Sequence, residues 1–397
     1  MPITPKTEPT LTPPAGKHHN IGVVNPFALV EIKLKRRFNW DRVANHQLFI
    51  QTILGFPYDK LFDPQYGSPL YPSLRYDAKK RALMSDLAVA DLPTLLSRMR
   101  ENDAIALGAG AAGGTEQKWV DPGHFFNRNP ADFTDPIQGA LPDCHFISAM
   151  ASLAWANPYA IAQRTRPIKD PDTFKQGDAV DMIQFYSGTG AAPKNIEVTE
   201  LLPLIEPGDI YQYARAADLE ETWPAVYEKA WVKWFTNDPG DQPDYSKVGG
   251  GDPIYDLVSL TGLNPTYKST QGVSGNAIWQ DVRSNCRGSW TFNPMAAWTY
   301  ASAADAPTPI NYNTAGLVAW HVYSILGWIY HENQDYIVLR NPWGNSPGSL
   351  NVDNGPWTAI EQVASGFTRT LNLPANGVFA LRADTFQQYF EGYGWVS

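Results

Sequence analysis

Apolar residues recur at three- and four-residue spacing in several stretches of the chain, which is the periodicity of amphipathic helices. These predicted helices cover residues 40–54, 92–99, 144–156, 219–235 and 277–286. Alternating or β-branched runs predict strands at residues 179–186, 196–202, 317–330 and 336–340, and a strand end at 28–34. Helices and strands therefore share the ordered part of the chain.

The last two predicted strands form an antiparallel hairpin around the polar turn His331–Asp335. Folding near residue 333 brings His321 and Asn341 to about the same level, within a few residues of slip. An amide oxygen beside an imidazole holds the ring in one tautomer, as a catalytic base requires. A lone histidine in a strand is more often a core residue. The pair indicates a catalytic site only if the chain also supplies a nucleophile.

Cys144 is the candidate nucleophile, because it follows the turn residues Pro142 and Asp143 and lies in the first turn of a helix. The free N–H groups and the dipole of that helix end favour a thiolate. The alternative is that Cys144 is a small core residue. His145 follows it directly, but neighbours on a helix point about 100° apart, so His321 is the better-placed base.

Composition narrows the class of protein. The 397 residues carry a net charge of −9, which argues against nucleic acid as the main partner. Two cysteines argue against a disulfide scaffold, and no signal-like or membrane-spanning apolar run is present, so we expect a cytoplasmic protein. Residues 1–20 are rich in Pro and Thr and predict a disordered tail. The 14 Trp and 19 Tyr leave open an aromatic-lined carbohydrate-binding protein.

Residues 103–113 contain a G-x-G-x-x-G pattern after a short apolar run, the outline of a dinucleotide-binding loop. That interpretation requires a helix next, whose N-terminus would hold the pyrophosphate. Pro122 interrupts the following stretch instead. We therefore interpret these residues as a connection and expect no nucleotide cofactor.

Taken in order, three motifs resemble those of the calpain family of papain-like cysteine proteases. They are QGALPDC at 138–144, WHVYS at 320–324 and RNPWG at 340–344, beside the family patterns Q-G-x-L-G-D-C, G-H-A-Y-S and R-N-P-W-G. Weaker similarities lie at 120–122, 223–231 and 377–390. The resemblance spans about residues 119–397 and leaves the first 118 unexplained.

The resemblance implies an α+β, papain-like core of two subdomains, with a helical cysteine lobe at 119–254 and an antiparallel β lobe carrying His and Asn at 255–397. Residues 21–118 would be an N-terminal extension of unknown role. By position, Cys144 would be the nucleophile, His321 the base and then the acid, and Asn341 the residue that orients the imidazole. Gln138 would donate to the oxyanion, and Trp343 would shield the pair from water.

Three residues depart from the family pattern. Pro142 replaces a Gly, His145 replaces a Trp, and Trp320 replaces the Gly before the base. Calcium is the only candidate cofactor, with Asp135 and Glu221 as its candidate ligands by resemblance, and hard oxygen ligands suit that ion. The loop after Asn341 lacks the acidic residues of the family's second site, so we expect an enzyme with no required cofactor and little or no dependence on calcium.

The leading hypothesis is a cysteine endopeptidase that forms an acyl-enzyme on protein or peptide substrates. Acyl transfer to an amine is a mechanistic neighbour, but such enzymes usually carry Asp where this chain has Asn341. A different class is a catalytically silent calpain-like module that binds proteins, which Pro142 and Trp320 would support. Carbohydrate binding is the weakest alternative, because it predicts none of the ordered motifs. The sequence does not indicate an oligomeric state.

Overall fold

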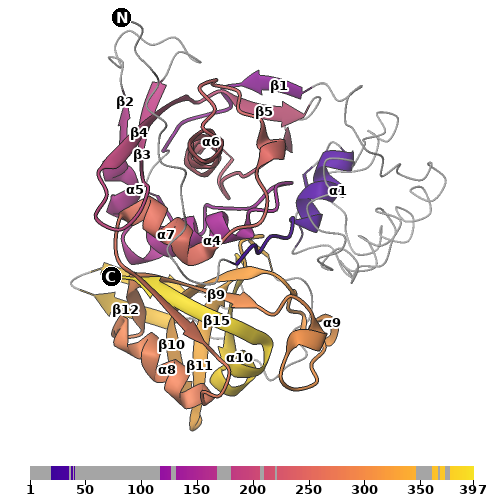
Figure 1. Ribbon diagram of the computed structural model, residues 1–397, viewed down its shortest axis with the longest axis vertical. Coiled ribbons are helices and arrows are strands. Elements are labelled where there is room, and N and C mark those ends of the chain that lie inside the picture. Colours follow the sequence, from indigo (N-terminus) through magenta and orange to yellow (C-terminus); the bar gives the residue numbers. More distant parts are fainter. Residues whose placement is uncertain are drawn as a thin grey trace, which may run out of the picture.

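The computed structural model describes residues 19–34, 37–38, 40, 117–126, 131–167, 180–205, 210–219, 221–345, 360–364, 367–371 and 376–397. Within these ranges the protein is α+β, with a helix-rich half and a half built on one large antiparallel sheet (Figure 1). The predicted helices at 40–54 and 92–99, the glycine pattern at 103–113 and nearly all of the predicted tail lie outside the described residues.

The large sheet runs in the order β14-β11-β10-β9-β15-β7, and β8 pairs with β9. Its strands are β7 (Pro265–Ser269), β8 (Cys286–Arg287), β9 (Trp290–Thr299), β10 (Val322–His331), β11 (Gln334–Arg340), β14 (Val378–Arg382) and β15 (Phe390–Val396). Helices α8 (Gly275–Ser284) and α10 (Ala383–Tyr389) pack on it, around buried aromatic residues such as Phe386 and Tyr323.

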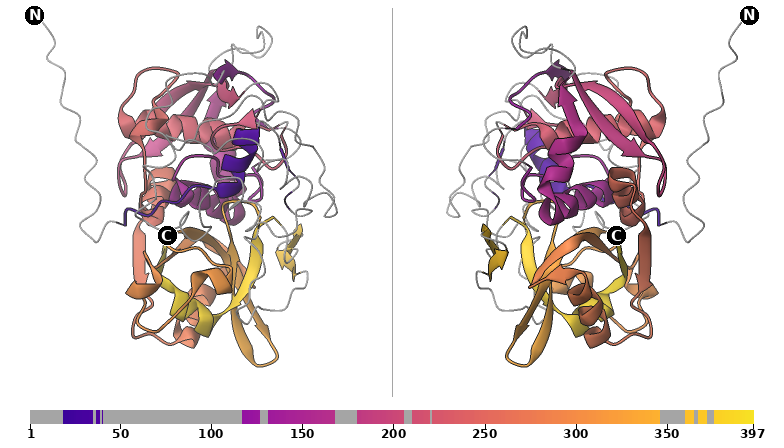
Figure 2. Two further views of the ribbon diagram at one scale, coloured as in Figure 1. Left: turned by 90° about the vertical axis from the view of Figure 1, so that its right-hand side faces the viewer. Right: turned by 90° about the vertical axis from the view of Figure 1, so that its left-hand side faces the viewer.

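The helix-rich half surrounds α4 (Cys144–Ala156), whose residues are buried up to Trp155. Around it lie α5 (Pro158–Arg164), α6 (Trp223–Thr236) and α7 (Pro253–Thr261), with the sheets β2-β3-β4 and β1-β5-β6. Those strands are β1 (Gln117–Val120), β2 (Thr165–Pro167), β3 (Val180–Tyr186), β4 (Pro193–Thr199), β5 (Leu202–Ile205) and β6 (Ile210–Tyr211). The two views in Figure 2, each turned by 90° from Figure 1, show the same two halves. The remaining short elements are η8 (Tyr245–Lys247), η9 (Ala303–Asp305), α9 (Tyr312–Ala315), β12 (Ile360–Ala364) and β13 (Phe367–Leu371).

The hairpin predicted from the sequence is confirmed as β10 and β11, with His331 opposite Gln334. Its two turn residues, Glu332 and Asn333, have φ of 47° and 60°. Two successive left-handed residues give the hairpin a turn whose twist matches that of the flanking strands. The first strand is shorter than predicted, because β10 begins at Val322 rather than at Leu317.

The strand end predicted at 28–34 is wrong, because these residues form helix α1 (Pro26–Leu34). Asn25 accounts for the helix start, since its Oδ1 accepts hydrogen bonds from the backbone N–H groups of Phe27 (3.0 Å) and Ala28 (3.4 Å). Pro26 is the first helical residue, where its missing N–H costs nothing. The apolar run that follows is buried at nearly every position, so its sequence has no clear helical period.

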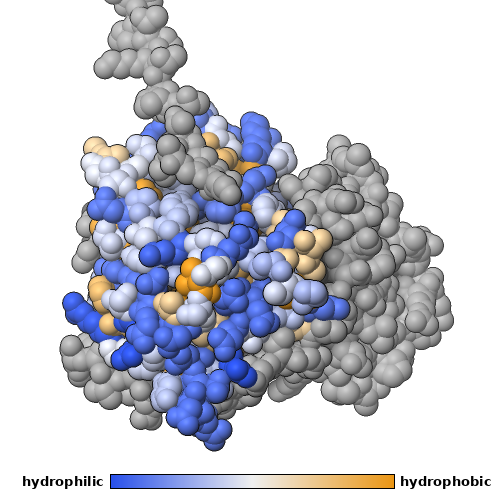
Figure 3. Space-filling view, turned by 60° about the horizontal axis from the view of Figure 1, so that its bottom comes forward, coloured by the Kyte–Doolittle hydropathy of each residue, from blue (hydrophilic) through white to orange (hydrophobic). Residues whose placement is uncertain are grey.

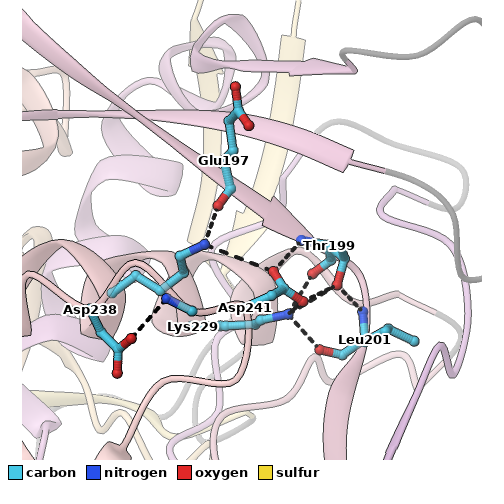
Figure 4. Close-up of polar contacts among 8 residues, drawn as sticks. Glu197, Thr199, Leu201, Lys229, Asp238 and Asp241 are labelled. Carbon is cyan, nitrogen blue, oxygen red and sulfur yellow. Dashed lines mark hydrogen bonds and ion pairs between the residues drawn. The ribbon is translucent and has the colours of Figure 1, made fainter.

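The strand predicted at 196–202 is divided between β4 and β5, which belong to different sheets. Lys229 on α6 explains the break (Figure 4). Its buried Nζ donates to the carbonyl oxygens of Thr199 (3.0 Å) and Leu201 (2.8 Å) and to Asp241 Oδ2 (2.8 Å). Because these carbonyl oxygens accept from Lys229, they do not pair with a neighbouring strand, and the strand is interrupted here.

The aromatic residues mostly fill the core. Among the described residues no tryptophan is exposed, and the fully buried ones include Trp155, Trp223 and Trp231. The face shown in Figure 3 is mainly hydrophilic, with only small apolar groups on its surface. In the part of the chain that the structure describes, no helix is long and apolar enough to cross a membrane.

Candidate active site

Cys144 is the first residue of α4 and has no exposed surface. Polar side chains along one face of α4 attach this helix to the large sheet. The Ser148 hydroxyl donates to the Val322 carbonyl (3.1 Å), and Trp155 Nε1 donates to the Leu326 carbonyl (2.6 Å), both on β10. The helix that carries the thiol is thereby fixed against the strand that follows His321.

His321 and Asn341 meet as the hairpin register predicts. The Nε2 of His321 lies 3.0 Å from the Oδ1 of Asn341, and both side chains are fully buried. The backbone N–H of Trp343 donates to the same Oδ1 (3.1 Å), which fixes the orientation of the amide. Since this oxygen can only accept, Nε2 carries the ring proton and Nδ1 carries the lone pair.

Two aromatic rings hold the imidazole of His321. The ring of Trp343 lies 4.7 Å from it, centroid to centroid, and the ring of Tyr323 lies edge-on at 4.9 Å. Trp343 is only 2% exposed and its ring contacts that of His321, whereas the shielding role that the resemblance implies stays a prediction. The Nδ1 of His321 has no hydrogen-bond partner among the described residues, so it is the ring atom left for proton transfer.

The thiol of Cys144 lies near the backbone that follows His321. The backbone N–H of Val322, the residue after His321, is close enough to the thiol to favour its thiolate form. Burial raises the pKa of the Cys144 thiol to about 12, although the N–H groups of Val23 and Val322 oppose this shift. Burial likewise lowers the pKa of His321 to about 3, although the hydrogen bond that its Nε2–H donates to Asn341 opposes this shift. In this closed environment the thiol and the imidazole are both neutral.

Gln138 lies beside these residues, in the loop before α4, and is fully buried. Its backbone N–H donates to the carbonyl of Pro342 (2.9 Å), which ties it to the Asn341 loop. Its side-chain Nε2 donates to the carbonyl oxygens of Val23 (2.6 Å) and Leu141 (2.7 Å). The side chain expected to polarise a substrate carbonyl therefore holds a carbonyl of this same chain.

Arg340 is a site residue whose role the sequence did not reveal. Its Nη2 donates to the carbonyl oxygens of Thr134 (2.8 Å) and Pro136 (2.9 Å), both in the loop that leads to Gln138. The side chain is fully buried. Because Arg340 directly precedes Asn341, these bonds connect the Gln138 loop to the hairpin. The feature of the sequence that could have indicated this role is the position of Arg340 at the start of the RNPWG motif.

His145 points away from the thiol. Its Nδ1 lies 2.5 Å from Asp256 Oδ2 on α7, and its Nε2 lies 3.1 Å from the carbonyl oxygen of Gly249. Burial lowers the pKa of His145, but the carboxylate of Asp256 outweighs this effect, so the net shift is upward. The residue that replaces the family's Trp thus forms a buried ion pair that supports the glycine run 249–251.

Trp320, the residue before the base, has a φ of 54°. A left-handed backbone suits Gly and is strained for a bulky side chain, by about 1–2 kcal/mol. The backbone here therefore has the conformation for which the family's Gly is suited, although the side chain is different. The ring is partly buried and packs against the core, which offsets part of the strain.

The predicted calcium ligands Asp135 and Glu221 are near one another and nearly buried. Burial, aided by the negative charge of Glu221, raises the pKa of Asp135 to about 7. Asp135 Oδ2 already accepts from Trp223 Nε1 (2.9 Å) and the N–H of Asp132 (2.8 Å). Calcium takes six to eight oxygens, and within the described ranges no three acidic, His or Cys side chains form a metal site. Calcium binding by this pair stays a prediction.

The structure therefore has a buried cysteine at the start of a helix, and a buried histidine whose Nε2 meets the side-chain oxygen of an asparagine. A family model described as calpain family cysteine protease matches residues 113–394, which is well over half of the chain. The chain belongs to the calpain family of cysteine proteases.

Three relatives carry this similarity. A thiol protease of Porphyromonas gingivalis is 25% identical over 271 residues, covering 64% of this chain and 53% of the relative. Calpain-9 of Homo sapiens is 28% identical over 254 residues, covering 61% and 34%. The calpain-type cysteine protease DEK1 of Arabidopsis thaliana is 23% identical over 260 residues, covering 61% and 11%. The chain matches about half or less of the length of these relatives.

Among solved structures, an NlpC/P60 endopeptidase from Photobacterium damselae subsp. piscicida is 10% identical over 59% of this chain and 51% of its own, with a TM-score of 0.16. A score this low does not indicate a shared fold.

Proposed function

We propose that this protein is a calpain-like cysteine endopeptidase with a papain-like core of two subdomains, whose substrate path lies between them. The hydrogen bond from His321 Nε2 to Asn341 Oδ1 carries the proposal, because it leaves Nδ1 of the imidazole without a partner among the described residues and able to take a proton. Membership of the calpain family supports a protease and makes proteins or peptides the expected substrates.

In the proposed mechanism, Nδ1 of His321 takes the thiol proton and the sulfur of Cys144 attacks the carbonyl carbon of the scissile bond. The oxyanion is stabilised by the Nε2–H of Gln138 and the backbone N–H of Cys144. His321 then gives its proton to the departing amine, which leaves a thioester on Cys144. Water, deprotonated by His321, attacks the thioester and releases the acid, so the enzyme returns with its proton on the thiol.

Asn341 acts by holding the imidazole. Its Oδ1 accepts the Nε2–H of His321 at every stage, which keeps Nδ1 directed at the reacting atoms and stabilises the imidazolium. The Trp343 ring keeps water away from this bond. The neutral pair in the closed form must become an ion pair during attack, which requires a more polar surrounding than the closed form provides.

The test is hydrolysis of a fluorogenic casein by the wild type, Cys144→Ser and the matched control Cys286→Ser, each with EGTA and with added calcium. We expect slow hydrolysis by the wild type and Cys286→Ser, limited by opening of the buried site, and none above background by Cys144→Ser. Equal hydrolysis by all three chains would overturn the role of Cys144.

A catalytically silent module is the second candidate, and the observation in its favour is that Cys144 and His321 are both completely buried. It predicts no hydrolysis from any variant in either condition, including variants in which the site is opened.

A further inference from the structure

Residues 19–25 form an extended segment that runs between the two halves of the molecule before entering α1; it is the thin indigo stretch in Figure 1. Ile21 pairs with Gly251 as an antiparallel bridge, with both N–H to carbonyl distances at 2.9 Å. Gly251 is the last residue of the glycine run 249–251, which lies between α6 and α7. The 19–25 segment is thus held by backbone bonds, in the way that an added strand or peptide is held.

The centre of the segment contacts the groups proposed for catalysis. The Val23 carbonyl accepts from Gln138 Nε2 (2.6 Å), and the Val23 N–H is near enough to the Cys144 thiol to oppose the rise in its pKa. Asn25 Nδ2 donates to the backbone carbonyl of Gln138 (2.7 Å). The Val23 carbonyl therefore occupies the donor that a substrate carbonyl would need.

Both ends of the segment are anchored on aromatic rings of the sheet half. On the N-terminal side, the ring of His19 lies 4.6 Å from that of Trp298 on β9. On the C-terminal side, Phe27 of α1 meets Trp343, the ring beside His321, edge-on at 6.0 Å. The chain thus passes over Cys144 from one side of the site to the other.

The burial of the segment and of the catalytic residues shows that solvent does not reach the Cys144 sulfur. Ile21, Val23, Cys144 and His321 are each 0% exposed, and Val24 is 1% exposed. Three apolar side chains of the segment are therefore removed from water, which favours the closed form. A substrate or a reagent reaches the sulfur only after the segment leaves.

We propose that residues 19–25 are an intramolecular occupant of the substrate path, which blocks Cys144 in the intact chain until the segment is displaced. This regulation rests on the proposed endopeptidase function, because it assigns the path to peptides. The ligand class it implies is an extended peptide whose backbone pairs with Gly251 and whose carbonyl accepts from Gln138.

Gly22 provides the test, because a side chain there does not fit. A Cβ on Gly22 would contact the Pro142 carbonyl oxygen and lie 2.6 Å from the Cα of Gly250, and neither backbone atom can rotate away. Gly22→Val should therefore expel the segment. Gly188→Val is the matched control, because a Cβ on Gly188 meets nothing within 4 Å.

The readout is the rate at which iodoacetamide alkylates Cys144 in the full-length chain, followed by peptide mass mapping, with Cys286 as an internal reference. Intact mass confirms that the chain is uncleaved before the assay. We expect at least a tenfold faster reaction at Cys144 in Gly22→Val, no change in Gly188→Val, and an unchanged rate at Cys286. Equal rates at Cys144 in the wild type and Gly22→Val would overturn the proposal.

A peptide of residues 19–34 added to Gly22→Val should restore protection of Cys144, and the same peptide carrying Gly22→Val should not. Protection by neither peptide or by both equally would contradict the proposal. If Gly22→Val does not fold, Ile21→Pro takes the place of that variant in the same assay. The proline removes the Ile21 N–H, which donates to the carbonyl of Gly251.

Casein hydrolysis separates this proposal from the proposed function. Faster alkylation of Cys144 in Gly22→Val without hydrolysis would support the occupant and overturn the endopeptidase. Hydrolysis and alkylation at the same rates in the wild type and Gly22→Val would overturn the occupant and support the endopeptidase.

Discussion

Ser152 and Met295 exchange two hydrogen bonds across the two halves of the protein: the Ser152 hydroxyl donates to the Met295 carbonyl and accepts from the Met295 N–H, both at 2.7 Å. Ser152 lies on the helix of Cys144, and Met295 lies on β9, beside the strand that follows His321. The positions of the thiol and the imidazole thus depend on polar bonds buried between α4 and the sheet.

Ser152→Ala should lower the free energy of unfolding by about 2 kcal/mol, because it leaves a buried N–H and a buried carbonyl without partners. Urea unfolding measures the change. Ser284→Ala, on the exposed face of α8, is the control and should stay within about 0.5 kcal/mol of the wild type. A Ser152→Ala protein as stable as this control would show that the two bonds contribute nothing.

Lys229→Met should destabilise the protein by about 3 kcal/mol, because the carbonyls of Thr199 and Leu201 lose their donor. Burial lowers the pKa of Lys229 to about 8, yet its contact with Asp241 keeps it charged at neutral pH. Thermal unfolding of Lys229→Met beside Lys247→Met, an exposed lysine, checks this. A similar unfolding temperature for the two variants would be the contrary result.

Asp143 and Glu228 should make the protein less stable as the pH rises. Burial raises the pKa of Asp143 to about 7, against a hydrogen bond from the Glu228 carboxyl, and burial raises the pKa of Glu228 as well. The folded state then binds more protons than the unfolded state above the ordinary carboxyl pKa of about 4, so stability falls between about pH 4 and 7.

Asp143→Asn should flatten that dependence, by up to about 4 kcal/mol over the whole interval. Unfolding free energies at several pH values measure the slope, with the surface variant Asp305→Asn as control. An unchanged slope in Asp143→Asn would exclude Asp143 as its source.

Asn341→Ala should lower casein hydrolysis by about a hundredfold, mainly through kcat, because the imidazole of His321 loses the acceptor that orients it. Asn341→Gln retains the amide but not its position and should be intermediate. The KM for a peptide substrate should change little in both. A loss that lies in KM alone would indicate that Asn341 binds substrate rather than positions His321.

Calcium should modulate hydrolysis weakly and EGTA should not abolish it, because Asp135 Oδ2 already accepts two hydrogen bonds from the protein. Complete loss of hydrolysis in EGTA, restored by calcium, would contradict this expectation. Asp135→Asn in the same assay tests whether any calcium effect arises at this pair.

The pairing of His321 with Asn341 could be predicted from the sequence because a hairpin is local. The polar turn at 331–335 fixes the register of β10 and β11, and the register places the two side chains. The helix start at Cys144 was similarly local, since Pro142 and Asp143 precede a clear helical period. The three motifs occur in the same order along the chain as in the calpain family, which related the cysteine helix to the hairpin.

The rest depended on contacts between distant residues. Nothing near Ile21 indicates that it pairs with Gly251, and the buried run after Pro26 fits a helix as well as a strand. The break after Thr199 is set by Lys229, on a helix further along the chain. The expected division of the two subdomains between residues 254 and 255 stays a prediction. That boundary falls within α7 (Pro253–Thr261), which packs on α4.

The most direct measurement of the central claim is intact mass spectrometry of the chain, quenched soon after mixing with an activated peptide ester. It should be made on the wild type, on Gly22→Val and on Gly22→Val combined with Cys144→Ser. The proposed mechanism predicts a transient adduct of the acyl group, mapped to Cys144, that is strongest in Gly22→Val and absent when Cys144 is replaced. Ester turnover with no adduct on Cys144, or with the same adduct after Cys144→Ser, would contradict it.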